Sequence, residues 1–125
     1  MPIALIVEDN KMNRKLLRDI LEFKFEVEEA ESAEAAIDLL DAVKPNIIFL
    51  DLQLPGMDGL AFARKLRKIP ANVDLPIVAV SAHAMQENID QALAAGCTEY
   101  VTKPITEDPF DFAERMALLV KEERE

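Results

Sequence analysis

The sequence is poor in the residues on which many covalent, metal and nucleotide sites depend. Its 125 residues include one cysteine, one histidine and three glycines. The single Cys97 cannot form a disulfide within the chain, so we expect a buried, reduced thiol in a compartment such as the cytoplasm. One histidine cannot build a zinc site alone, and scattered glycines exclude a glycine-rich loop that would cradle a nucleotide. These absences argue against disulfide-stabilised, zinc-dependent and ATP-binding proteins.

A net positive charge and long apolar runs are also missing. The formal net charge is −10, and part of the acidic excess lies in the tail 121–125. Nucleic-acid binding needs a basic surface that displaces counterions, so we expect protein partners and no nucleic acid. No apolar run approaches the ~20 residues that cross a bilayer. Because the N-terminus also lacks the features of a signal peptide, we expect a cytoplasmic protein without membrane contact.

What the chain does have is an alternation of two apolar patterns along its length. Apolar runs at 3–7, 47–50 and 77–80 predict strands buried on both faces. The segments 26–29 and 97–102 mix charged and apolar residues, which is typical of edge strands. Apolar residues at helical spacing predict helices over residues 12–21, 36–43, 62–69, 85–93 and 113–120.

This order of elements predicts one domain over residues 1–125 with an α/β fold. Strand composition favours the flavodoxin-like (βα)5 three-layer sandwich, in which a parallel sheet has the order 2-1-3-4-5. Helix caps are expected at Ser32, Asp58 and Asp108-Pro109, and Gly96 should end the fourth helix. In such folds ligands bind at the carboxyl ends of the strands, between the first and third strands.

Polar residues follow four of the predicted strands at their carboxyl ends. Glu8 and Asp9 follow the first, Asp51 the third, Ser81 the fourth and Lys103 the fifth. Three carboxylates at one edge repel one another and imply a cation; oxygen ligands completed by water are typical of Mg²⁺. Because Mg²⁺ commonly binds phosphate oxygens, Lys103 and Ser81 would complete a site for one phosphoryl group. Asp51 is then either a further metal ligand or the nucleophile.

Each of these residues also has a simpler structural explanation. The Glu8-Asp9 pair could cap the following helix, and a lysine before proline is ordinary in a surface turn. Asp51 is the hardest to explain in this way, because a Pro/Gly turn rather than a helix follows it directly. The ordered set at four strand ends is therefore a stronger signal than any one member.

Four segments together resemble a known family. They are Ile6-Val7-Glu8-Asp9-Asn10, Asp51-Leu52-Gln53-Leu54-Pro55-Gly56-Met57-Asp58-Gly59, Val80-Ser81-Ala82 and Tyr100-Val101-Thr102-Lys103-Pro104. They resemble the motifs of the receiver domain of two-component response regulators, and the resemblance covers essentially the whole chain. The Glu-Asp-Asn variant looks most like single-domain cell-cycle regulators and the receivers of hybrid kinases.

The resemblance implies that Asp51 accepts a phosphoryl group from a histidine kinase or a histidine phosphotransfer protein. It further implies that Mg²⁺ is bound by Asp9, Asp51 and the backbone carbonyl of Gln53, and by Glu8 through water. Lys103 would contact the phosphoryl group. The Gln53 side chain would be placed to tune how long the phosphate lasts.

The resemblance also implies how the signal leaves the domain. Ser81 would contact the phosphoryl group and move toward it, which would let Tyr100, at the switch-aromatic position, turn inward. The partner surface would then be the face made by the fourth helix, fifth strand and fifth helix. We expect Ala92, Ala95 and Tyr100 near its middle, and His83 at a rim where it could tune the phosphate lifetime.

Two other classes of function stay open. An Asp-nucleophile phosphohydrolase also forms an aspartyl phosphate at a strand end, but such enzymes commonly carry a second aspartate two residues on, where this chain has Gln53. A phosphorylation-independent adaptor would not need the acid, lysine and hydroxyl set. We therefore expect a receiver that catalyses only its own phosphorylation and dephosphorylation. The initiating Met1 and the compact ending favour a stand-alone receiver without an output domain.

Overall fold

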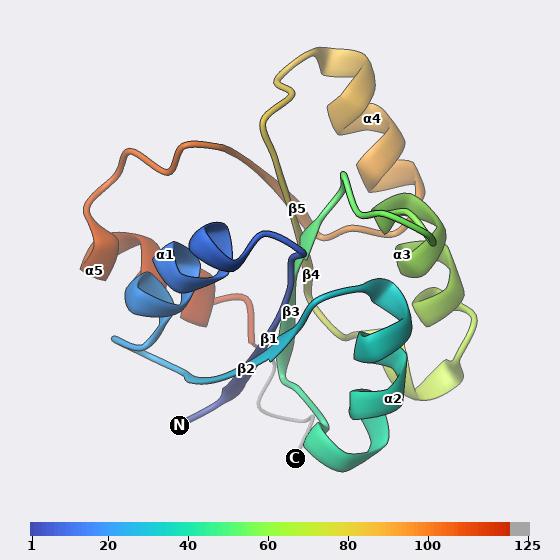
Figure 1. Cartoon of the computed structure of the whole chain (residues 1–125), viewed down its shortest axis with the longest axis horizontal. Helices are drawn as coiled ribbons and strands as arrows, with labels where there is room; N and C mark the ends of the chain where they lie inside the picture. The colour runs from blue at the N-terminus through green and yellow to red at the C-terminus, as the bar shows by residue number, and fades with distance from the viewer. Residues whose placement is uncertain (121–125) are drawn as a thin grey trace.

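A computed structural model describes residues 1–120, and the charged tail 121–125 lies outside the described residues. Strands and helices alternate along the described chain (Figure 1). Their bounds are β1 Ile3–Val7, α1 Lys11–Leu21, β2 Glu26–Ala30, α2 Ala33–Val43, β3 Ile47–Asp51, α3 Gly59–Arg67, the short 3-10 helix η1 Pro70–Asn72, β4 Ile77–Ser81, α4 Gln86–Ala94, β5 Glu99–Thr102 and α5 Pro109–Ala117. Among these residues, no helix has the length and hydropathy to span a membrane.

The strands form one parallel sheet in the order β2-β1-β3-β4-β5, which confirms the predicted fold class. Strands β3 and β4 are buried throughout, and β1 is buried from Ala4 onward. The edge strand β2 exposes Glu26 and Glu28, and β5 exposes Thr102. Charge on β2 discourages pairing with another chain at that edge.

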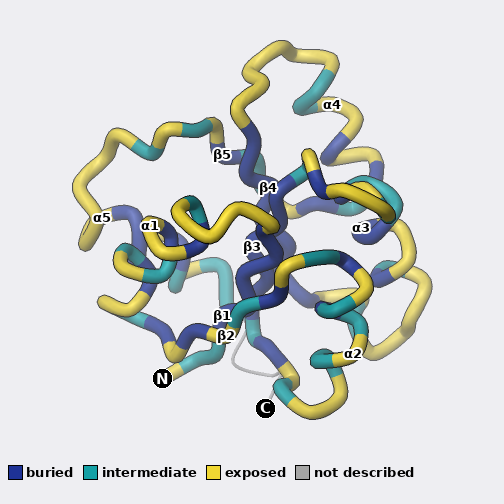
Figure 2. The backbone as a smooth tube through the Cα atoms, viewed as in Figure 1, coloured by how far each residue is buried: buried dark blue, intermediate teal, exposed yellow. Residues whose placement is uncertain are grey.

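The helices cover both faces of the sheet and create two apolar cores (Figure 2). On one face α1 and α5 pack Leu21 and Phe112 against the sheet. On the other, α2, α3 and α4 contribute residues such as Ala36, Phe62 and Ala92. Burying one large apolar side chain contributes about 1.5–3 kcal/mol, so these layers fix the strands whose ends carry the polar residues.

The buried face of α4 differs from the one that the apolar spacing predicted. Met85 and Leu93 are 65% and 47% exposed, whereas Ala92 and Ala95 are 0% and 3% exposed. Ala92 and Ala95 therefore cannot lie in the middle of a partner surface, and that prediction is wrong. Small alanine side chains let α4 approach the sheet closely, so the larger apolar residues face outward. Tyr100 remains partly exposed on β5.

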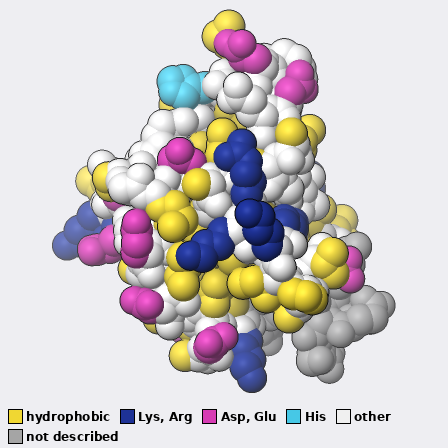
Figure 3. Space-filling view, turned by 90° about the vertical axis from the view of Figure 1, so that its right-hand side faces the viewer, with side chains coloured by type: hydrophobic (Ala, Val, Ile, Leu, Met, Phe, Trp, Pro, Cys, Tyr) yellow, Lys and Arg dark blue, Asp and Glu magenta, His cyan; other side chains and the backbone are white. Residues whose placement is uncertain are grey.

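Charge is distributed unevenly over this acidic protein. The last turn of α3 and its C-cap carry four basic residues, Arg64, Lys65, Arg67 and Lys68. Lysine and arginine side chains gather on the corresponding side of the molecule (Figure 3). The partial negative charge of a helix C-terminus favours cations in this position. Arg67 also ties α3 to its neighbours, because its Nε donates to the carbonyl oxygen of Gly96 at 2.9 Å.

Candidate phosphoryl and metal site

The parallel register of the sheet brings the polar strand ends together. Val7 is paired with Leu50, Asp51 with Val80 and Ser81 with Thr102. Glu8 directly follows the interior strand β1, and Lys103 directly follows the edge strand β5, so both reach the same edge as Asp51 and Ser81. This edge is the one at which ligands bind in doubly wound sheets.

Glu8, Asp9 and Asp51 form an acidic cluster. One carboxylate oxygen from each lies within 4.8 Å of the others, and among the described residues this is the group of acids and histidines that could hold a metal ion. Glu8 and Asp51 are both 5% exposed, whereas Asp9 is exposed. An all-oxygen set that is open on one side suits a hard divalent cation that keeps several waters.

The Lys103 ammonium group lies between two of these carboxylates. Its Nζ is 3.1 Å from Glu8 Oε1 and 3.6 Å from Asp51 Oδ2. Burial raises the pKa of Glu8, and the neighbouring Asp51 carboxylate adds to this rise; the Asn10 backbone N–H and Lys103 oppose it. Keeping the Glu8 carboxylate ionised at this site therefore costs free energy, and a bound cation would offset that cost.

Helix capping does not explain the acidic pair. The N-cap of α1 is Asn10, whose side chain accepts a hydrogen bond from the Asn13 N–H at 2.9 Å. Glu8 Oε2 accepts one from the Asn10 N–H at 3.0 Å, and its other oxygen contacts Lys103. The three caps predicted at Ser32, Asp58 and Asp108 are confirmed.

A chain of hydrogen bonds leads from the site to the edge strand β5. The Ser81 hydroxyl donates to Gln53 Oε1 at 3.2 Å and accepts from the His83 backbone N–H at 3.1 Å. The His83 carbonyl oxygen in turn accepts from the Tyr100 hydroxyl at 2.6 Å. His83 thus joins Ser81 to Tyr100 through its backbone. The Gln53 backbone N–H also donates to Asp51 Oδ1 at 2.9 Å.

One further residue contacts the acidic segment without having been expected from the sequence. Arg14 lies on the buried face of α1, and its Nη1 donates to the carbonyl oxygens of Glu8 at 3.0 Å and Asp9 at 3.1 Å. The only sequence signal was a charged residue on a helix face shared with Leu17 and Leu21.

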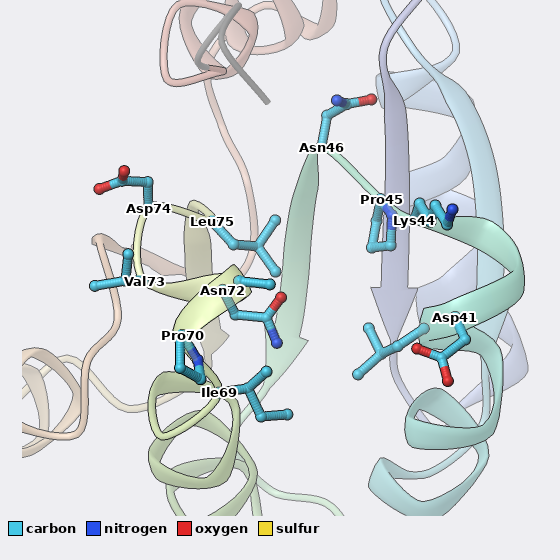
Figure 4. Close-up of a pocket in the computed structure, with 12 residues that line it drawn as sticks. Asp41, Lys44, Pro45, Asn46, Ile69, Pro70, Asn72, Val73, Asp74 and Leu75 are labelled. Carbon is cyan, nitrogen blue, oxygen red and sulfur yellow. The ribbon is translucent and has the colours of Figure 1, made fainter. Parts of the chain in front are cut away.

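Of two hollows on the surface, one adjoins the acidic site and the other does not. A groove of about 410 Å³ begins at Glu8 and Lys103 and is otherwise largely apolar, with Leu16, Ile20 and Ile105 in its lining. A larger hollow of about 680 Å³ lies between the end of α2 and η1 (Figure 4). It does not include any of the polar strand-end residues.

Comparisons with known proteins agree with this arrangement. Residues 4–112 match the family model of the response regulator receiver domain. The polar-differentiation response regulator DivK of Brucella ovis is 36% identical over 104 residues, which cover 82% of this chain and 85% of that protein. A CheY-like receiver domain protein from Methanospirillum hungatei is 28% identical with a TM-score of 0.81, and the match covers 94% of this chain and 92% of that one. The Mn²⁺-bound form of response regulator Rcp1 shares the fold, with a TM-score of 0.76, 23% identity and coverage of 93% and 91%.

Proposed function

Because this chain belongs to the response regulator receiver domain family, we propose that it is phosphorylated on Asp51 by a histidine kinase or histidine phosphotransfer protein. The observation that carries the proposal is the position of Asp51, buried at a strand end, with Lys103 Nζ 3.6 Å away and two further carboxylates beside it. Phosphoryl transfer depends mainly on positioning and charge neutralisation, and this set of groups supplies both.

In the proposed reaction, a carboxylate oxygen of Asp51 forms a bond to phosphorus as the phosphorus–nitrogen bond of the donor breaks. The Gln53 N–H bond to Asp51 Oδ1 restricts rotation of the carboxylate. Lys103 and the Ser81 hydroxyl would contact oxygens of the transferred group, and Ser81 would have to leave Gln53 to do so. Bound Mg²⁺ would neutralise charge on the phosphoryl oxygens.

We assign the metal to Asp9, Asp51 and the Gln53 backbone carbonyl as ligands, with Glu8 binding it through water. The hard oxygen donors and the exposed side of the cluster support Mg²⁺. The Mn²⁺-bound form of response regulator Rcp1, which shares this fold, is consistent with a divalent cation as the metal.

Signalling would proceed through protein contacts rather than through a reaction on another substrate. We assign the output surface to α4, β5 and α5, centred on Tyr100 instead of the buried alanines. We propose that the phosphodonor protein docks on the apolar groove beside α1, because Glu8 and Lys103 belong both to that groove and to the site.

A buried Cys97 thiol, whose pKa is raised by burial to about 11, suits a reducing cytoplasm.

Intact mass spectrometry after incubation with acetyl phosphate and Mg²⁺ tests the phosphoacceptor. We expect wild type to gain one phosphoryl group, and the matched variant Asp51→Asn to gain none. Omitting Mg²⁺ in the presence of EDTA should leave both proteins unmodified. A stable phosphoryl adduct on Asp51→Asn under the same conditions would overturn the assignment.

A further inference from the structure

Arg14 is buried at a position where a charged side chain is expensive. It is 8% exposed and lies on the face of α1 that also buries Leu17 and Leu21. Replacing a buried ion pair by apolar residues of similar size is often neutral or stabilising. Stability alone therefore does not account for an arginine at this position.

The contacts of Arg14 instead join three parts of the chain. Its Nη1 bridges the carbonyl oxygens of Glu8 and Asp9, and its Nε donates to Glu29 Oε1 on β2 at 3.0 Å. Nη2 lies 3.6 Å from Glu31 Oε1. A planar guanidinium fork can hold two carbonyl groups and a carboxylate at once, which a lysine ammonium group on a flexible stem does less well.

We propose that Arg14 is a positioning residue that fixes residues 8 and 9 in the conformation that binds a divalent cation. The inference rests on the proposed metal site. Arg14 holds the successive carbonyl groups of Glu8 and Asp9. The backbone at these two residues is thereby fixed, and their carboxylates stay beside Asp51. Losing a contact that orients metal ligands commonly weakens metal binding by about 10–100-fold.

The charge of Arg14 and its contacts to residues 8 and 9 predict opposite effects of its removal on metal affinity. The guanidinium carries positive charge beside a site for a cation. Its removal should therefore strengthen metal binding if charge decides the outcome. If positioning decides the outcome, removal should weaken binding.

Arg18 provides a matched control. It lies one turn further along α1 and bonds the same Glu29 side chain, and its Nη2 donates to the Val27 carbonyl oxygen at 3.0 Å. The Arg18 guanidinium bonds Glu22, Glu29 and the Val27 carbonyl oxygen, and does not bond residue 8 or residue 9. Substituting Arg18 thus disturbs the same link between α1 and β2 while leaving the acidic segment in place.

The experiment measures Mn²⁺ binding to the unphosphorylated protein from the electron paramagnetic resonance signal of free Mn²⁺. Variants are Arg14→Met, Arg14→Lys and Arg18→Met, with Asp9→Asn to identify binding at the site. We expect both Arg14 variants to lose about 10–100-fold in affinity, and Arg18→Met to stay close to wild type. Thermal unfolding of each variant shows whether lost affinity merely follows lost stability.

Wild-type affinity in Arg14→Met would overturn the inference while leaving the proposed function intact. So would losses in Arg14→Met and Arg18→Met that both follow their unfolding temperatures. If wild type and Asp9→Asn bind Mn²⁺ equally, the proposed metal site itself fails, and the inference falls with it.

Discussion

At the scale of single residues, Glu8 shows most directly that the site is built at the expense of stability. Its pKa is raised in the folded protein, mainly by burial. The contribution of this one group therefore favours folding most when Glu8 is protonated. This contribution is fully present below the unfolded-state pKa of about 4.3 and is lost as the pH rises through the raised folded-state value. At neutral pH the ionised Glu8 opposes folding; Lys103 offsets part of this cost, and a bound divalent cation would offset more.

We therefore expect Glu8→Gln to unfold at higher urea than wild type at neutral pH without divalent metal. The difference should shrink as acid protonates Glu8 in wild type, because glutamine resembles the protonated carboxyl group. Urea unfolding in EDTA at several pH values measures this. Glu28→Gln, at an exposed position on β2, is the control and should change little. A glutamine variant less stable than wild type at neutral pH would contradict the argument.

Leu16 is an exposed residue in the groove that we propose as the docking surface of the phosphodonor. It is 59% exposed although it lies in the groove next to the site. We expect Leu16→Asp to change the free energy of unfolding by less than about 0.5 kcal/mol. If the donor protein packs here, transfer from a phosphorylated histidine kinase should slow by about tenfold, equivalent to ~1.4 kcal/mol. Modification by acetyl phosphate should continue at the wild-type rate.

The matched control for this surface is Leu118→Asp. Leu118 is 82% exposed and does not line the groove. Its substitution should leave both phosphorylation rates unchanged. Equal slowing by the two variants would mean that the effect is not specific to the groove.

At the scale of secondary-structure elements, the face of α4 that packs against the sheet differs from the face that apolar spacing predicts. Ala92 is fully buried, and its neighbour Leu93 is 47% exposed. Ala92→Leu should overpack the space between α4 and the sheet and cost about 1–3 kcal/mol. Leu93→Lys should change stability by less than about 0.5 kcal/mol. Urea denaturation of the two variants measures both values, and the reverse order would place the buried face of α4 wrongly.

The strands could be predicted from the sequence more fully than the helix faces. The continuous apolar runs of β1, β3 and β4 have few alternatives to burial on both faces, so their place in the sheet followed from composition. The face of α4 depended on the width of the gap between helix and sheet, which composition does not reveal. The prediction from apolar spacing placed large apolar residues against the sheet, whereas the gap between α4 and the sheet has room only for alanine side chains.

The candidate site could likewise be predicted in part. Its acids, lysine and hydroxyl follow strands whose parallel register brings them together, so strand order was enough to place them. The contacts of Arg14 could not be foreseen, since they depend on how α1 is rotated about its axis. The same holds for the bond between Tyr100 and the His83 carbonyl, which depends on the path of the chain after β4.

Hydrogen bonds made by the segment after β4 join the end of β4 to β5, and we propose that they carry the signal. Ser81, His83 and Tyr100 form successive hydrogen bonds. If Ser81 moves toward a phosphoryl group, the bond to His83 must change, and Tyr100 then loses or moves its acceptor. Beryllofluoride with Mg²⁺, which imitates the phosphoryl group, should therefore change the fluorescence of Tyr100. This signal is specific because the chain has one tyrosine and no tryptophan.

Amide chemical shifts of α4 should move under the same conditions. In Ser81→Ala, which lacks the hydroxyl group, both changes should be much smaller, although Mg²⁺ binding should persist. The proposed route fails if beryllofluoride leaves Tyr100 fluorescence and the α4 amide shifts of wild type unmoved.

At the scale of the whole molecule, the net charge of −10 makes the folded state dependent on salt. Like charges are closer together in the compact fold than in the unfolded chain, so their repulsion opposes folding. Salt shortens the screening length from about 10 Å at 0.1 M to about 3 Å at 1 M. The urea midpoint should therefore rise with NaCl concentration while the slope of the unfolding transition stays constant.

The cations at the end of α3 should reduce this dependence, because they offset part of the surrounding acidic charge (Figure 3). Substituting Lys65→Glu and Lys68→Glu replaces two exposed positive charges with negative ones, so the urea midpoint should fall at low salt and rise more steeply with NaCl. Asp38→Lys, on the exposed side of α2, changes the net charge in the opposite direction and should flatten the dependence. If all three proteins gain stability equally with salt, specific ion effects rather than repulsion would account for the stabilisation. Such a result would mean that repulsion between like charges does not measurably affect the stability of this protein.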